Sequence, residues 1–319
     1  MNDPAAQPVD IEEQRQWLID HKASSGASWG TLAKRLNIAL GTLSQFGSQR
    51  GYAGNEQALA DKIFRYRQTL AAQKSLRVEA PEIPGYFETE TSAQLIHMLH
   101  WAQRGRIVTA AMGAGLGKST TAKHFQACNS NVFMATMTPS TSGMFGMQRA
   151  VLRALGMMNC TGMTQVLSER VIKLVSDLDS PLLIVDEAQH LSERALEEMR
   201  SWHDQTGLGI ALFGNESVQQ RLEGNRSAVY AQLFSRQSLK LVRSMPLTAD
   251  IDALIDAWRV RDEAACNFVH QIAKKPGALR GATFTIELAS MLAMASHEEL
   301  AVEHLQDAWA QLSARAVLS

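Results

Sequence analysis

The sequence is poor in cysteine and has no long apolar stretch, and both absences narrow its class. Its 319 residues contain three cysteines, Cys128, Cys160 and Cys266, which lie far apart and form no Cys-x-x-Cys pair. This usage argues against structural disulfides or a zinc site and favours a reducing cytosol. No apolar run approaches the length of a membrane helix, and the polar, proline-bearing first ten residues do not have a signal-peptide pattern. We therefore expect a cytoplasmic protein that does not enter a membrane.

The chain also lacks a net charge of either sign. Its formal charge is −1, whereas an independent high-affinity DNA binder is expected to be basic. If it binds DNA, it should do so as a polymer or only with nucleotide present. With 45% hydrophobic residues and no internal repeat, the chain can bury a full α/β core and a small additional domain.

A glycine-rich stretch at residues 112–120 carries the first chemical signal. It reads Met-Gly-Ala-Gly-Leu-Gly-Lys-Ser-Thr, after an apolar strand-like segment at 106–111 and before a helix-like segment at 120–125. Because glycine has no Cβ, such a turn can bring its backbone N–H groups against a phosphate chain at the positive end of a helix. A glycine-rich turn without a ligand is the alternative. The residues expected at the nucleotide are Gly113, Ala114, Gly115, Leu116, Gly117, Lys118, Ser119 and Thr120.

Two side chains of this loop have specific expected roles. Lys118 can reach the β- and γ-phosphates of ATP, and the Ser119 hydroxyl can ligate Mg²⁺. The loop departs from the consensus at one position, because Met112 stands where glycine is usual. We expect the preceding strand to deliver this residue to the turn.

About seventy residues later, an apolar run at 182–185 ends on Asp186 and Glu187. The run is typical of a central strand of a parallel sheet that is buried on both faces. Asp186 is expected to hold the magnesium, and Glu187 to orient and deprotonate the attacking water. An ordinary helix start would also explain two acidic residues, but the upstream loop favours the catalytic interpretation.

Three further residues are candidates for the same site. A third apolar strand at 209–213 precedes Asn215, which could bond the γ-phosphate or the lytic water. Arg280 could reach the phosphates from a helical lid, and Arg236 could reach a neighbouring subunit's nucleotide. A turn asparagine and two surface arginines are the alternatives, and Arg221, Arg226 and Arg243 are also candidates for the residue that acts in trans.

With these motifs in order, the chain resembles the AAA+ ATPases, and among them the DNA transposition helpers of the phage Mu B type. Insertion-sequence helpers and secretion ATPases of the ExeA type are related. The likeness spans roughly residues 85–290, and its Asp-Glu-Ala-Gln-His segment is the most specific part. The motifs that carry it lie at 87–91, 115–119, 185–191, 213–216, 233–236 and 277–280.

The resemblance implies more than the residues show by themselves. It implies an ATPase that uses ATP and Mg²⁺, forms a homo-oligomer or helical filament on double-stranded DNA, and works with a Mu A-like transposase in the cytosol of a bacteriophage's host. It implies that Asn215 is the first sensor residue, which contacts the γ-phosphate or the lytic water, and that Arg280 is the second, which contacts the phosphates from the lid. It makes Arg236 the arginine that acts in trans on a neighbouring subunit's nucleotide, while Lys118 and Glu187 complete the catalytic set.

An N-terminal segment is expected to bind DNA. Residues 28–38 and 39–46 have the layout of a helix-turn-helix, whose second helix enters the major groove. Between Lys22 and Arg77 there are nine basic residues against two acidic ones, a footprint for phosphates. A protein-docking module with a basic face is the alternative. The expected DNA contacts here are Thr42, Ser44, Gln45, Gln49 and Arg50, and those within the ATPase core are Arg149 and Arg153, beyond a polar loop at 138–146.

The predicted fold class is thus α/β, with a P-loop AAA+ parallel sheet flanked by helices, an N-terminal helix-turn-helix domain and a C-terminal helical lid. Prolines and glycine near residues 81–85 and Pro246 mark the boundaries. Residues 247–319 include ten acidic and six basic residues, so we expect the lid to be a poor DNA surface. We expect a helix-turn-helix domain at 1–79, a linker at 80–86, the ATPase core at 87–245 and the lid at 246–319.

Three functions fit these features. The favoured one is a DNA-stimulated ATPase that coats DNA with little sequence preference and presents it to a transposase. The second is a transcription regulator whose helix-turn-helix reads an operator while ATP sets the oligomeric state. The third, an ExeA-like secretion ATPase, would be expected to carry a membrane span or a peptidoglycan-binding region, and the sequence shows neither.

Overall fold

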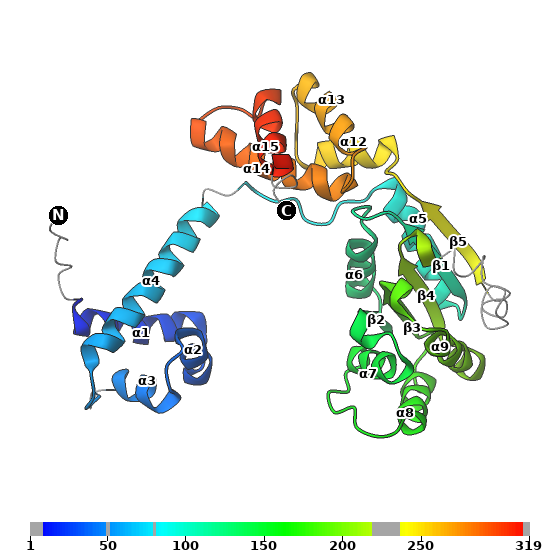
Figure 1. Ribbon diagram of the computed structural model, residues 1–319, viewed down its shortest axis with the longest axis horizontal. Helices are drawn as coiled ribbons and strands as arrows, with labels where there is room; N and C mark the ends of the chain where they lie inside the picture. Colours follow the sequence, from blue (N-terminus) through cyan, green and yellow to red (C-terminus); the bar gives the residue numbers. More distant parts are fainter. Residues whose placement is uncertain (1–8, 49–51, 79–80, 219–236, 315–319) are drawn as a thin grey trace. The chain divides into compact units, whose positions relative to one another are not determined.

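The computed structural model describes residues 9–48, 52–78, 81–218 and 237–314, and the chain divides into two compact units, Met1–Ala80 and Pro81–Ser319 (Figure 1). Among these described residues, no helix is long and apolar enough to cross a membrane. Each unit has its own apolar core, so each is described by itself.

The N-terminal unit is a bundle of helices around Leu18, Leu32, Leu43, Phe46 and Ile63, whose side chains are all fully buried. These apolar residues come from every helix of the unit, which explains why short helices can be stable here although they would be marginal alone. The helices are α1 (Ile11–Ser25), α2 (Trp29–Leu36), α3 (Leu40–Phe46) and α4 (Glu56–Val78).

Helices α2 and α3 are joined by the three residues 37–39, which is the spacing of a helix-turn-helix. Asn37 ends α2 in the left-handed conformation, with φ of 51°, and its N–H group bonds the carbonyls of Ala33 and Lys34. Asparagine tolerates this conformation better than most residues, so the sequence encodes the turn locally. Ser28 caps the start of α2 by accepting from the Thr31 N–H.

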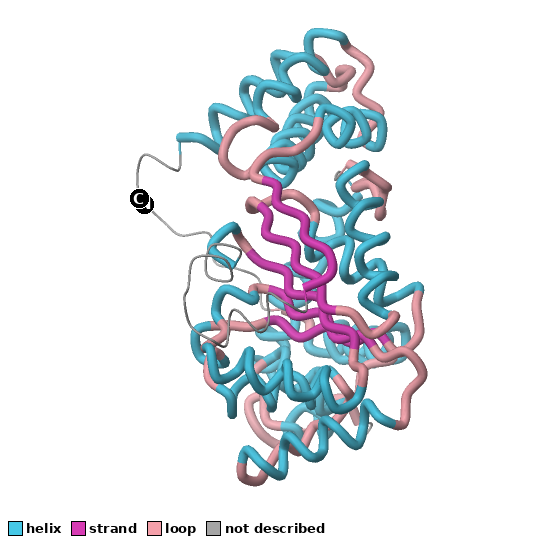
Figure 2. Tube along the Cα trace, turned by 90° about the vertical axis from the view of Figure 1, so that its right-hand side faces the viewer, coloured by secondary structure: helices cyan, strands magenta, loops and turns pink. Residues whose placement is uncertain are grey.

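The C-terminal unit is built on a five-stranded parallel sheet with strand order β2-β3-β4-β1-β5, and helices cover both of its faces (Figures 1 and 2). Every residue of β1, β3 and β4 is buried, as expected for central strands. The elements are α5 (Glu90–Gln103), β1 (Ile107–Met112), α6 (Lys118–Cys128), β2 (Val132–Thr136), η1 (Pro139–Thr141), α7 (Met144–Ala154), α8 (Thr164–Ser176), β3 (Leu182–Asp186), η2 (Ala188–His190), α9 (Glu193–Thr206), β4 (Gly209–Gly214) and β5 (Gln237–Arg243).

The pairing register brings the ends of three strands to one edge of this sheet. Val185 of β3 pairs with Leu212 of β4, and Ala111 of β1 pairs with Gly214 of β4. The residues that follow these strands therefore meet at the carboxyl edge, where ligands bind in open α/β sheets. The predicted α/β fold with a parallel sheet is confirmed.

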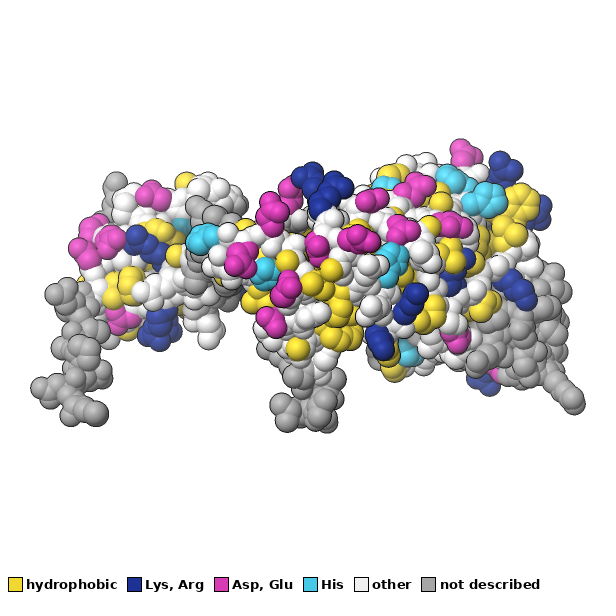
Figure 3. All heavy atoms as spheres, turned by 90° about the horizontal axis from the view of Figure 1, so that it is seen from above, with side chains coloured by type: hydrophobic (Ala, Val, Ile, Leu, Met, Phe, Trp, Pro, Cys, Tyr) yellow, Lys and Arg dark blue, Asp and Glu magenta, His cyan; other side chains and the backbone are white. Residues whose placement is uncertain are grey.

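The helices after β5 form a separate apolar cluster that includes Ile251, Leu254, Val269, Ile286 and Leu305. They correspond to the predicted helical C-terminal region. Their exposed face carries many acidic side chains in Figure 3, in line with the acidic composition of this part. The helices are α12 (Thr248–Ala257), α13 (Glu263–Ile272), α14 (Ala278–Ser296) and α15 (Val302–Ala314).

A buried carboxylate fastens these C-terminal helices to the sheet domain. Asp250 of α12 is fully buried and accepts from the Thr91 N–H (2.8 Å), the Thr91 hydroxyl (2.5 Å) and the Leu247 N–H (3.0 Å). Arg243, at the end of β5, donates to the same Thr91 hydroxyl and to the Gln94 side chain. Since Thr91 lies in α5, the network joins α5, β5 and α12 at one point.

Replacing Asp250 with alanine should lower the free energy of unfolding by about 3 kcal/mol, because two buried donors and one partly buried donor would be left without their acceptor. Asp252→Ala on the same helix is the control, since this exposed carboxylate pairs with His270 at the surface and should contribute less than about 1 kcal/mol. Urea denaturation of both variants measures the difference. Equal losses of stability would contradict a fastening role for Asp250.

Candidate nucleotide site

The glycine-rich loop joins β1 to α6, and two of its glycines, Gly115 and Gly117, have left-handed φ values of 81° and 82°. A Cβ on Gly113 would lie 2.5 Å from the Ser244 carbonyl oxygen, and one on Gly115 would lie 2.0 Å from the Gly277 carbonyl oxygen. The glycines are therefore required by close packing within the chain as well as by the turn itself. The loop is held between the end of β5 and the start of α14.

Met112 fits the loop because it belongs to the strand. It is the last residue of β1, pairs with Arg243 and has no left-handed φ, so a side chain is tolerated there. Its carbonyl accepts from the Lys118 ammonium at 2.8 Å, and the Gly113 carbonyl accepts from the same group at 2.9 Å. The strand thus delivers Met112 to the turn, as the sequence predicted.

The Lys118 ammonium lies across the loop in a partly buried position. Burial lowers its pKa below the ordinary value, the carboxylates of Asp186 and Glu187 act in the opposite direction, and Arg280 adds to the lowering. Two neutral carbonyls are its hydrogen-bond acceptors in the loop. An anionic phosphate would be a stronger acceptor for this cation.

Asp186 and Ser119 place two oxygen donors side by side. Asp186 is the last residue of β3 and almost fully buried, and its Oδ2 atom accepts from the Ser119 hydroxyl at 2.6 Å. Its Oδ1 atom accepts from the Glu187 N–H at 3.0 Å. A carboxylate and a hydroxyl are the hard oxygen ligands that Mg²⁺ prefers, so this pair fits the expected metal.

Glu187 has the left-handed conformation, with φ of 57°, which is unusual for a residue with a side chain. Its carboxylate accepts a short hydrogen bond from the Gln189 amide. The side-chain carbonyl oxygen of Gln189, Oε1, accepts in turn from the Asn215 backbone N–H at 3.3 Å. Gln189 therefore joins the residue after β3 to the residue after β4.

A cavity of about 450 Å³ is lined by two chemically different sets of residues. The polar set includes Lys118, Ser119, Glu187, Gln189 and Asn215, which suits a triphosphate. The other set consists of aromatic, aliphatic and backbone groups from residues before α5 and from the C-terminal helices, which suits a flat apolar base. The latter residues include Pro84, Gly85, Tyr86, Leu254 and Leu279.

Tyr86 is fixed by a parallel stack on His124 of α6, with ring centroids 3.6 Å apart. Arg280 also lines the cavity, and its backbone N–H group donates to the Gly115 backbone carbonyl at 3.3 Å. No sequence motif marks Tyr86, Leu254 or Leu279 as residues of this site. Tyr86 is brought there by its stack on α6, and Leu254 and Leu279 by the packing of α12 and α14 beside the loop.

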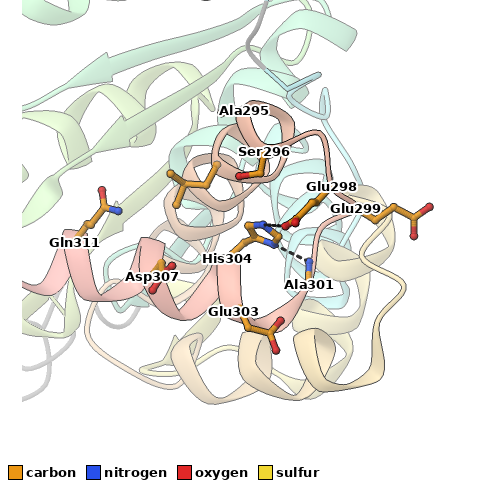
Figure 4. Close-up of a pocket in the computed structure, with 10 residues that line it drawn as sticks. Ala295, Ser296, Glu298, Glu299, Ala301, Glu303, His304, Asp307 and Gln311 are labelled. Atoms are coloured by element: carbon orange, nitrogen blue, oxygen red, sulfur yellow. Dashed lines mark hydrogen bonds and ion pairs between the residues drawn. The ribbon is translucent and has the colours of Figure 1, made fainter.

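A larger cavity of about 740 Å³ lies between the end of α14 and α15 and is unsuited to a nucleotide (Figure 4). Its lining is acidic, so it would repel phosphates. His304 bonds Glu298 at 3.2 Å and accepts from the Ala301 N–H at 3.3 Å there. Its acidic residues are Glu298, Glu299, Glu303 and Asp307.

The structure brings together the nucleotide residues predicted from sequence, and none of the predicted DNA contacts that it describes lines the same cavity. Residues 114–120, Glu187, Asn215 and Arg280 line one cavity, and Gly113 and Asp186 adjoin it. Gln189 was part of a family motif but had no assigned role, and its only sequence signal was its position two residues after Glu187. Gln49, Arg50, Arg221, Arg226 and Arg236 lie outside the described residues.

The predicted DNA contacts that are described lie on two surfaces. Thr42 and Ser44 are half-buried and Gln45 is exposed, all on α3. On α7, Arg149 lies over the Phe145 ring at 5.6 Å, and Arg153 is exposed. Arg243, a further candidate for the trans role, instead bonds Thr91 and Gln94 of its own chain.

Structural comparison supports the fold. A structure of Drosophila ORC bound to DNA aligns with a TM-score of 0.52 and 14% identity, covering 74% of this chain and 64% of that one. A Walker-type ATPase of Pyrococcus abyssi aligns with a TM-score of 0.52 and 10% identity, covering 75% and 76%. At these identities the likeness concerns the fold alone.

Sequence comparison identifies the family. Residues 103–222 match the AAA domain family, and residues 235–312 match the family described as Mu B transposition protein, C terminal. The ATP-dependent target DNA activator B of Escherichia phage Mu is 30% identical over 95% of both chains. The Mu-like prophage FluMu DNA transposition protein B of Haemophilus influenzae is 31% identical over 84% of this chain and 93% of that one. The chain belongs to the Mu B family of DNA transposition proteins, which are ATPases of the AAA superfamily.

Proposed function

We propose that this protein is an ATP-dependent DNA-binding ATPase that oligomerises on target DNA with little sequence preference and delivers that DNA to a transposase. The observation that carries the proposal is the assembly of Lys118, Ser119, Asp186 and Glu187 at one edge of the sheet, in a chain of the Mu B family. The name of the phage Mu relative, a target DNA activator, supports the same role.

In the proposed reaction Lys118 binds the β- and γ-phosphates, and Ser119 and Asp186 hold Mg²⁺. The ion would neutralise charge on the phosphates. Glu187 takes the proton from the attacking water, and Asn215 bonds the γ-phosphate or that water. The left-handed backbone at Glu187 supports this assignment, because strained conformations of this kind are concentrated at functional sites.

DNA is proposed to bind to α3 of the N-terminal unit and to α7 of the ATPase domain. Between Lys22 and Arg77 this unit carries nine basic residues against two acidic ones. Of these basic residues, Lys34, Arg35, Lys62 and Arg65 are exposed. Phosphate contacts from such side chains give affinity without sequence specificity. Thr42, Ser44, Gln45, Gln49 and Arg50 are the proposed contacts of the first surface, and Arg149 and Arg153 those of the second.

Oligomerisation is proposed to complete the ATPase site. Arg236 would stabilise the γ-phosphate of a neighbouring subunit, and Arg280 would sense the nucleotide of its own chain, which its place in the cavity supports. DNA and a Mu A-like transposase are the proposed partners of this ATPase. The protein is therefore proposed to work in the cytosol of the host bacterium.

Lys118→Ala should weaken ATP binding by about tenfold or more, because the variant loses the charged hydrogen-bond donor to the β- and γ-phosphates. ATP-dependent retention of random-sequence duplex should disappear with it. The matched control is Lys123→Ala, an exposed lysine of the same helix. Fluorescent-nucleotide titration and duplex binding with ATP or ADP measure both effects, and wild-type behaviour of Lys118→Ala would refute the site.

Glu187→Gln should leave ATP and DNA binding intact but reduce hydrolysis by about 10²- to 10⁴-fold, the usual contribution of a general base. Complexes on DNA should therefore persist after free ATP is removed. The control is Glu169→Gln, an exposed residue of α8. Wild-type turnover in Glu187→Gln would show that another group activates the water.

Footprinting with ATP should show continuous protection along a duplex of random sequence, and electron microscopy should show coated DNA that is absent with ADP. Protection of one defined site would instead indicate a transcription regulator. These outcomes differ because binding through phosphates tracks the backbone, whereas readout of base edges selects a site.

The double variant Arg149→Ala/Arg153→Ala should weaken DNA binding equally on all sequences and reduce the slope of log affinity against log salt by about two, one for each arginine that no longer neutralises a phosphate. Arg261→Ala, an exposed arginine of the acidic C-terminal region, is the control and should leave the slope unchanged. An unchanged slope in the double variant would exclude α7 from the DNA interface.

A further inference from the structure

The Gln189 side chain makes two contacts that no general requirement of the fold explains. Its amide donates to the Glu187 carboxylate, and its carbonyl oxygen accepts from the Asn215 N–H at 3.3 Å. It follows β3, comes from the short helix η2 and lines the nucleotide cavity together with both of these residues. One side chain thus spans the gap between the proposed general base and the end of the neighbouring strand.

The absence of a side chain at Gly214 leaves room for the Gln189 side chain. A Cβ on Gly214, the last residue of β4, would lie 2.5 Å from the Gln189 carbonyl oxygen and 2.5 Å from a Val218 methyl group. Gly214 has no left-handed φ, so its backbone conformation does not by itself demand glycine. The missing side chain instead lets Gln189 approach the end of β4 closely enough to bond Asn215.

Glu187 needs such support. A glutamate side chain has three rotatable bonds, and a general base must stay within hydrogen-bond reach of the proton that it takes. Among the contacts described for Glu187, its own N–H group bonds Asp186, while its carboxylate is oriented by Gln189. Fixing the carboxylate before the water arrives avoids the cost of ordering it during the reaction.

We propose that Gln189 is a positioning residue that aligns the Glu187 carboxylate for water activation and ties its position to the backbone of Asn215. Because Asn215 lines the same cavity, a movement of its backbone would reach Glu187 through the Gln189 amide. The proposal rests on the role of Glu187 as the general base.

Gln189→Ala should lower kcat by about tenfold to a hundredfold, the range expected when a reacting group is misplaced by about an ångström. The dissociation constant for ATP should change less than about twofold, since Gln189 acts through Glu187. Gln189→Glu keeps the length and an acceptor but removes the N–H donor and sets two carboxylates together, so its kcat should fall at least as far. The control is Gln165→Ala, because Gln165 bonds the Glu169 carboxylate at 3.0 Å on the exposed face of α8.

A double-mutant cycle separates positioning from a structural effect. Single-turnover hydrolysis is measured for the wild type, Gln189→Ala, Glu187→Ala and the double variant, with thermal melting of each to confirm folding. If Gln189 acts through Glu187, its replacement should change the residual rate of Glu187→Ala by less than about twofold, because interacting residues are not additive. The same fall in rate in both backgrounds would overturn the proposal.

Other results would also overturn it. An unchanged or raised kcat in Gln189→Ala would mean that the side chain does not align the base, and a parallel loss of ATP affinity would indicate a structural role. Failure of the underlying assignment gives a different pattern, because Glu187→Ala itself would then retain wild-type turnover. The two failures are therefore distinguishable in one set of four proteins.

Discussion

The site depends on three parallel strands that end at the same edge of one sheet. The backbone hydrogen bonds that pair β1 with β4 and β4 with β3 fix the heights of Met112, Gly214 and Asp186 relative to one another. Only this register lets the Ser119 hydroxyl, at the start of α6, reach the Asp186 carboxylate at 2.6 Å. A shift of one residue in either pairing would separate Asp186 from Ser119, the two expected metal ligands.

The C-terminal helices contribute residues to the same cavity. The loop glycine Gly115 packs against the Gly277 carbonyl at the start of α14, and Leu254 and Leu279 line the cavity. Asp250 fastens α12 to α5 and β5 through Thr91. The cavity is therefore lined by residues of both the sheet domain and the C-terminal helices that this network joins.

The residues that the sequence motifs single out lie together in the structure, and each motif is local. A glycine-rich loop between a strand and a helix, or an apolar run that ends on two carboxylates, contains its own geometric reason within ten residues or fewer. The effect of Met112 could not be settled from sequence, and the structure shows that this residue ends β1, where a side chain is tolerated. By contrast, Tyr86 and Gln189 have no local signature, because their roles depend on α6 and on the end of β4 respectively.

By itself the sequence determined the fold class and the order of the motifs, and it predicted the roles of Lys118, Ser119, Asp186 and Glu187, since these follow from residue type and spacing along the chain. Only the tertiary structure decided which residues from distant parts of the sequence support this site. These are the apolar residues that line the cavity, the buried Asp250 network and the Gln189 amide that joins Glu187 to Asn215. The physical reason is that hydrogen bonds and packing between residues far apart in sequence depend on strand register and helix packing, which no single segment specifies.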